Sequence, residues 1–151
     1  KVYQVRGALD VLAARLAAQQ RFRIDLKLIE RGRRAARGRN VEAMIDADVA
    51  FHQAIYAASG NPLIGQSADP HWRHLRRAMG AVLQAEPQRE SLWDEHEAIA
   101  DAIAAGDVER AARLSDEHVS RASDALAERL AQQLARTASS SGIPTKKGDK
   151  A

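Results

Sequence analysis

Four separated polar residues interrupt the apolar stripes of three predicted helices, and they constrain the fold more than any other feature of the sequence. Over residues 41–58, apolar side chains recur at helical spacing, and Asp48 and His52 lie in that stripe one turn apart. His96 and His118 fill similar positions in two later stripes. A buried carboxylate is strongly disfavoured unless it is paired or bound to a metal, and a buried imidazole still needs hydrogen-bond partners. The four side chains are therefore predicted to meet in one core.

Each of these residues also has an ordinary structural explanation. A lone histidine on an apolar face is commonly a core residue with satisfied hydrogen bonds, and Asp48 could pair with an arginine. In combination, imidazole nitrogens and a carboxylate suit zinc, and also nickel, manganese, cobalt or iron. Asp48 and His52 would have Cβ atoms about 6 Å apart, close enough to hold one ion. The residues alone leave a metal site and a satisfied polar core as equal alternatives.

Composition favours an all-α domain. The 151 residues suffice for one domain, and 45% hydrophobic content with only 4% aromatics indicates helices that pack through small side chains. The absence of cysteine excludes disulfides, cysteine zinc sites and thiol catalysis. No apolar run reaches about 18 residues and no signal-like region opens the chain, so we expect a cytoplasmic protein that does not enter a membrane. The start at Lys1 instead of Met suggests that an N-terminal part is missing.

The periodicity predicts an antiparallel bundle of six to seven helices, followed by a disordered tail over residues 138–151. The predicted helices cover approximately residues 2–19, 24–37, 41–58, from 62 onward, 91–105 and 108–136. The number of helices depends on Pro70, which should kink the fourth helix or break it, with Asp69 capping a second piece.

Cap residues set the predicted boundaries. Gly38 is suited to a left-handed cap after the second helix, and Asn40 should cap the third. Asn61 followed by Pro62 is a strong start signal for the fourth helix. Other boundary signals are Pro87 and a capping-box spacing of Ser91 with Asp94 before the fifth helix, and Gly106 with Asp107 after it.

Nothing in the sequence supports catalysis directly. The chain has no glycine-rich phosphate loop, no nucleophile with an evident base and no helical H-E-x-x-H pair. His71 and His74 are interpreted as part of a polar surface, although they could form a second site. The arginine groups at residues 31–39 and 73–77 are interpreted as solvated helix ends, with phosphate contact as the alternative.

The motifs around the four polar residues resemble the FCD domain, the ligand-binding C-terminal domain of the FadR-type branch of the GntR transcription regulators. The resemblance covers about residues 1–137. It is carried by the opening helix over residues 2–18, with Asp10 where Glu is usual, by Asp48-Val49-Ala50-Phe51-His52 as a D-x-x-F-H motif, by the helix break at residues 58–63, by Glu95-His96 through Gly106-Asp107, and by His118.

This resemblance implies a helical bundle that binds a divalent metal through Asp48, His52, His96 and His118. A small carboxylate effector, such as a sugar acid or hydroxy acid, would bind at the open coordination positions or in the adjacent cavity. Such domains usually form homodimers and follow a winged helix-turn-helix domain. That domain is absent from this chain, so DNA would be bound by the missing domain and not directly by these residues.

Arginines are the candidate groups for binding the effector, because guanidinium binds a carboxylate through two hydrogen bonds. We expect this role for Arg6, near the apolar face of the first helix, and for Arg76 or Arg77 on the fourth; surface exposure is the alternative for all three. The leading hypothesis is a non-enzymatic effector sensor. The rival hypotheses are a metal-dependent helical-bundle enzyme acting on a small organic acid and a purely structural interaction module.

Overall fold

The described part of the chain is entirely helical apart from its connections, which confirms the predicted all-α class. The computed structural model describes residues 1–84 and 90–142. Within these ranges there are six helices, so the six-helix alternative is the observed one. They are α1 (Val2–Gln19), α2 (Leu26–Gly38), α3 (Val41–Ala58), α4 (Pro62–Val82), α5 (Leu92–Ala105) and α6 (Val108–Ser140).

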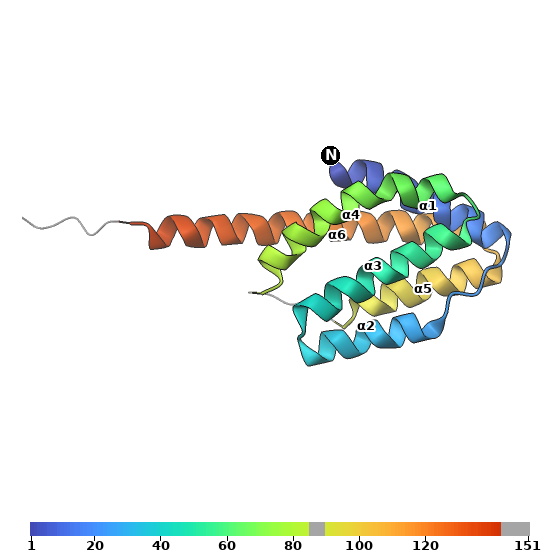
Figure 1. The fold of residues 1–151 in the computed structure, drawn as a ribbon, viewed down its shortest axis with the longest axis horizontal. Coiled ribbons are helices and arrows are strands. Elements are labelled where there is room, and N and C mark those ends of the chain that lie inside the picture. Colours follow the sequence, from blue (N-terminus) through green and yellow to red (C-terminus); the bar gives the residue numbers. More distant parts are fainter. Residues whose placement is uncertain (85–89, 143–151) are drawn as a thin grey trace, which may run out of the picture.

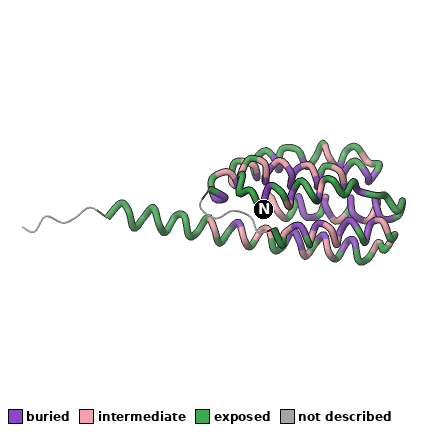
Figure 2. The backbone as a smooth tube through the Cα atoms, turned by 90° about the horizontal axis from the view of Figure 1, so that it is seen from below, coloured by how far each residue is buried: buried purple, intermediate pink, exposed green. Residues whose placement is uncertain are grey.

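The helices form a bundle around one core, and α6 continues beyond it (Figure 1). Helix α1 packs mainly on α6, α2 on α3, and α5 on α6. Buried residues line the inside of the bundle, whereas the projecting part of α6 is exposed (Figure 2). Close packing of α1 depends on small side chains, since Ala13, Ala14, Ala17 and Ala18 have no exposed surface. No described helix is both long and apolar enough to cross a membrane.

The predicted caps mostly hold. The side chains of Asn40, Asn61 and Asp107 each accept a hydrogen bond from a backbone N–H in the first turn of α3, α4 and α6. Gly106 ends α5 in the left-handed region with φ 72°, where glycine carries no Cβ penalty. Ser91 is the N-cap of α5 but makes no side-chain capping hydrogen bond, so the proposed capping box is not formed. Local sequence therefore fixes most of the helix boundaries.

The end of α2 differs from the prediction. Gly38 is the last helical residue, and the left-handed residue is Arg39, with φ 54°. The start is also later than predicted, because the Asp25 carboxylate accepts from the Lys27 N–H and so sets the N-cap. The residue in the left-handed conformation therefore follows Gly38 directly, whereas the sequence predicted Gly38 itself in that position.

Helix α4 is continuous through Pro70, so the predicted break with Asp69 as a new cap is wrong. Asp69 lies within the helix and pairs with Arg73 at 3.4 Å. Proline removes one hydrogen-bond donor, but the buried side chains of Ala68 and Trp72 on either side hold the helix on the core. Tertiary packing has outweighed the local signal.

Helix α6 extends to Ser140, four residues beyond its predicted end at Arg136. The hydroxyls of Thr137 and Ser139 donate to carbonyls one turn earlier, both at 3.0 Å, which is compatible with helix. Residues 138–140 of the predicted tail are therefore helical. The remainder of that tail from residue 143, and Pro87, lie outside the described residues.

Gly32 allows α2 to lie directly against the largest buried side chain of α5. A Cβ at this position would lie 1.9 Å from Cε2 and from Cζ2 of Trp93. The Trp93 ring has no exposed surface and packs edge-on against the ring of His96, with centroids 4.4 Å apart. Gly32 therefore determines how closely α2 approaches the part of the core that contains His96.

We predict that Gly32→Ala destabilises the protein by about 1–3 kcal/mol, because the added methyl group forces Trp93 to move in a closely packed core. Gly80→Ala is the matched control, since a Cβ at that helical position meets nothing within 4 Å. The control should be neutral or stabilising by up to about 1 kcal/mol. Urea unfolding midpoints measure both effects, and equal midpoints for the two variants would contradict the prediction.

Candidate metal centre

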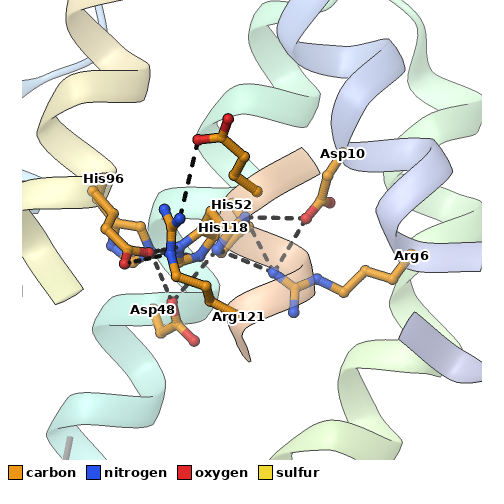
Figure 3. Close-up of polar contacts among 9 residues, drawn as sticks. Arg6, Asp10, Asp48, His52, His96, His118 and Arg121 are labelled. Carbon is orange, nitrogen blue, oxygen red and sulfur yellow. Dashed lines mark hydrogen bonds and ion pairs between the residues drawn. The ribbon is translucent and has the colours of Figure 1, made fainter. Parts of the chain in front are cut away.

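The four polar residues singled out in the sequence meet in the core, as predicted. Asp48 and His52 come from α3, His96 from α5 and His118 from α6, and all four are buried. One ligand atom from each lies within 4.8 Å of the corresponding atoms of the other three. Figure 3 shows the four side chains converging on one another from α3, α5 and α6. Helical spacing alone thus identified which side chains face inward.

The separations within this cluster are compatible with one small cation. The Nε2 atoms of His96 and His118 are 3.1 Å apart, and Asp48 Oδ1 lies 3.3 Å from His96 Nε2 and 3.5 Å from His52 Nε2. Ligands 2.0–2.1 Å from a tetrahedral zinc ion are about 3.3 Å from one another. Three imidazole nitrogens and one carboxylate oxygen are also the donor set that zinc and related divalent ions accept.

Asp48 Oδ1 gives an independent sign that the cluster is suited to a cation. This oxygen is buried and has no hydrogen-bond partner among the described residues, and neither has His96 Nδ1. A buried unpaired carboxylate oxygen is costly. Coordination to a metal would satisfy it, so the residues present fit the ion that the sequence predicted.

The protonation states also favour ligation. Burial lowers the pKa of His52 well below its ordinary value, and the charge of Arg6 lowers it further. Burial likewise lowers the pKa of His96, with His118 adding to the effect. Both imidazoles are therefore neutral near pH 7, which is the form that binds metals.

Carboxylates orient two of the three imidazoles. His118 Nδ1 donates to Glu95 Oε2 at 2.7 Å, which leaves the lone pair of His118 on Nε2, facing the cluster. Burial opposes the charge of Glu95, but the hydrogen bond from His118 and the charge of Arg121 outweigh it, so the pKa of Glu95 is lowered. His52 Nδ1 lies 3.5 Å from Asp10 Oδ2 in a comparable arrangement. Such outer carboxylates fix the tautomer of a metal-binding histidine.

Arg6 is a cation in direct contact with this cluster. Its Nη2 lies 3.2 Å from His52 Nε2 and 3.1 Å from Asp10 Oδ2, and only 2% of the residue is exposed. Burial opposes the charge on Arg6, but the carboxylates of Asp10 and Asp48 outweigh it and raise its pKa. Arg6 therefore stays charged in the core.

Aromatic groups hold the Arg6–Asp10 pair in place. The guanidinium carbon of Arg6 lies 4.2 Å from the centre of the Trp72 ring. The Tyr56 hydroxyl donates to Asp10 Oδ1 and accepts from Trp72 Nε1 at 2.9 Å. Burial raises the pKa of Tyr56, so its hydroxyl keeps its proton and remains a donor. The pair is thus fixed by contacts from α3 and α4.

A cavity of about 380 Å³ opens beside the cluster. Arg6, Asp48 and His118 line it, together with Glu95 and Arg121, whose side chains pair at 2.9 Å. A ligand in this cavity would meet both the guanidinium and two of the four cluster residues. The arrangement places a charged guanidinium beside the candidate metal ligands.

The structure brings only one of the three predicted effector-binding arginines to this cavity. Arg76 instead pairs with Asp46 at 2.7 Å, and Arg77 is exposed; neither lines the cavity. Both lie on the part of α4 that faces away from it, because Trp72, Leu75 and Met79 occupy the inward positions. His71 and His74 also lie outside the cluster, on α4.

Several residues around the cluster were not predicted. Asp10 could have been predicted from the sequence, because it lies in an apolar stripe four residues after Arg6, and this is the spacing of an ion pair on a helix. Arg121 lies one turn after His118 and could have been found similarly. Glu95 and Tyr56 had no such signal, because their partners lie on helices distant in the sequence.

Comparison with solved structures supports the fold. McbR/YncC of E. coli, a regulator of the GntR family, superposes with a TM-score of 0.77 over 85% of this chain and 64% of that chain, at 20% sequence identity. The chain thus spans less than two thirds of that protein. No curated protein matches the chain.

The model of the FCD domain family matches residues 1–121, a range that contains all four cluster residues and Arg6. The match covers most of the chain and confirms the resemblance seen in its motifs. This chain belongs to the FCD domain family, and its general role is that of an effector-binding regulatory domain.

Proposed function

We propose that this chain is the effector-sensing domain of a cytoplasmic transcription regulator of the GntR family. It binds a divalent metal, zinc in the first instance, through Asp48, His52, His96 and His118, and a small carboxylate effector beside that metal. It acts as a homodimer without catalysing a reaction, and it controls DNA binding by a winged helix-turn-helix domain of the same regulator. The observation that carries the proposal is the buried four-residue cluster beside a cavity that also contains a charged arginine.

The roles of the side chains follow from their positions. The metal would supply a positive charge that attracts a carboxylate oxygen. Arg6 offers N–H groups on the same cavity wall, and a guanidinium with a carboxylate makes a strong charge-assisted contact. Asp10 balances the charge of Arg6 when the cavity is empty of anion. Ligand binding that shifts α1 against α6 would transmit the signal, and coupling of about 1–3 kcal/mol changes affinity at a distant site roughly 5–150-fold.

Metal binding is tested first. Asp48→Asn keeps the shape of the side chain but removes its charge, and His118→Ala removes a ligand. Each should lower zinc affinity by at least about 100-fold, more than the loss of an outer-shell partner. Competition with a chromophoric chelator measures the affinity, and elemental analysis gives the zinc content. His74→Ala, outside the cluster, should bind zinc as the parent does; stoichiometric zinc in all three variants would refute the site.

The role of Glu95, the carboxylate that accepts from His118, is tested separately. Glu95→Gln should lower zinc affinity about 10–100-fold, because an amide accepts less strongly from His118 Nδ1 and no longer fixes its tautomer. The neighbouring Glu97→Gln is the control, since Glu97 pairs with Arg33 at 2.5 Å and does not contact the cluster. Equal zinc affinities for the two variants would show that Glu95 has no such role.

Arg6 is tested with Arg6→Lys, which preserves the charge but removes the planar pair of donors. Carboxylate affinity of the zinc-loaded protein should fall by about 2 kcal/mol, or roughly 30-fold. Arg77→Lys is the control at an exposed position outside the cavity. Calorimetric titration with acetate gives the affinities, and recovery of the acid unchanged after incubation distinguishes sensing from turnover. An Arg6→Lys variant that binds acetate as tightly as the control would contradict this role.

A further inference from the structure

The wall of the cavity changes character with distance from the four-residue cluster. Near the cluster it is charged, with Arg6, Asp48 and His118 close together (Figure 3). Away from the cluster, hydrocarbon side chains from three helices form one section of it: Met79, Val82 and Leu83 at the end of α4, Leu92 at the start of α5, and Ala125 and Leu126 on α6. Tyr3, Ser91 and Arg121 also line the cavity.

The apolar section has a definite length. His118 and Leu126 both line the cavity and are eight residues apart on α6, which corresponds to about 12 Å along a helix. Beyond Leu126, the lining becomes polar again at Glu128, Arg129 and Gln132. An occupant anchored beside His118 would pass Arg121, whose side chain pairs with Glu95, and would then extend along several side chains that offer no hydrogen bond.

This wall discriminates between classes of acid. A sugar acid carries a hydroxyl on nearly every carbon, and hydroxyls that face Met79, Leu83 or Leu126 would lose their water without gaining a partner. A hydrocarbon tail has no hydrogen bonds to lose there, and the burial of its apolar surface is favourable. The apolar section of the wall therefore disfavours polyhydroxylated acids and favours acids with an unsubstituted carbon chain.

We propose that the effector is a monocarboxylate with a hydrocarbon tail, whose carboxylate lies at Arg6 and the metal and whose tail lies between α4 and α6. This inference rests on the proposed function, because it takes the carboxylate anchor from it. It adds the chemical class of the remainder of the ligand. The tail contacts Met79, Val82, Leu83 and Leu126.

A series of acids tests the tail. Calorimetry on the zinc-loaded chain would use acetate, butanoate, hexanoate and octanoate. Affinity should rise about fourfold for each methylene that enters the apolar section. The matched pair 2-hydroxyhexanoate and gluconate shares the first two carbons and differs only in the hydroxyls further along. The hydrocarbon member should bind at least about tenfold more tightly, and equal or tighter binding of gluconate would overturn the proposal.

A substitution tests the location. Ala125→Leu fills part of the apolar section and should weaken octanoate binding about tenfold or more while leaving acetate binding unchanged. Ala127→Leu is the matched control, because Ala127 is exposed on α6 and does not line the cavity. Octanoate affinity that is the same in both variants would overturn the proposed position of the tail.

The outcomes separate this inference from the proposed function. Acids that bind to the zinc-loaded chain with no dependence on tail length overturn the inference alone. If zinc binds but none of the acids does, the proposed effector role fails, and the inference fails with it. Affinity that rises along the series and falls selectively in Ala125→Leu supports both.

Discussion

One carboxylate and three imidazoles buried together among apolar side chains are the constraint on which the rest of the structure depends. Each of these groups would be costly in the core without a polar partner. The partners come from different helices: Asp10 of α1 lies beside His52 of α3, and Glu95 of α5 beside His118 of α6. The cluster therefore fixes the relative positions of four helices, and the small alanine side chains of α1 allow the close approach that those contacts require.

His96 is held differently from the other two histidines. Its Nδ1 has no hydrogen-bond partner among the described residues, whereas the Nδ1 atoms of His52 and His118 each lie near a carboxylate oxygen. Aromatic rings orient it instead: Phe51 stacks on it with centroids 4.3 Å apart, and Trp93 packs edge-on. Because Trp93 in turn lies against Gly32, a backbone position on α2 helps to orient an imidazole that it does not touch.

The sequence predicted features that depend on neighbouring residues or on helical period. The caps at Asn40, Asn61 and Asp107 need only the first turn of their own helix, and period 3.6 was enough to place the four cluster residues on inward faces.

Features that depend on tertiary packing were not predictable in this way. Pro70 lies in a continuous helix because its neighbours are buried on the core, and Arg39 instead of Gly38 adopts the left-handed conformation where the chain turns into α3. Glu95 and Tyr56 have partners that only the fold brings near. Arg6, Arg76 and Arg77 are all candidates in the sequence, yet only the helix packing shows that Arg6 lines the cavity and the other two do not.

Arg6 and a metal ion would compete for the same nitrogen, and this links the two ligands of the proposed function. The guanidinium donates to His52 Nε2 at 3.2 Å, and one lone pair cannot serve both a guanidinium and a cation. An ion bound to His52 would therefore release Arg6, which would keep Asp10 as a partner but lose one acceptor. A carboxylate in the adjoining cavity would replace that acceptor and neutralise the added charge. Ion and acid should then each favour binding of the other by the same factor, as linkage requires.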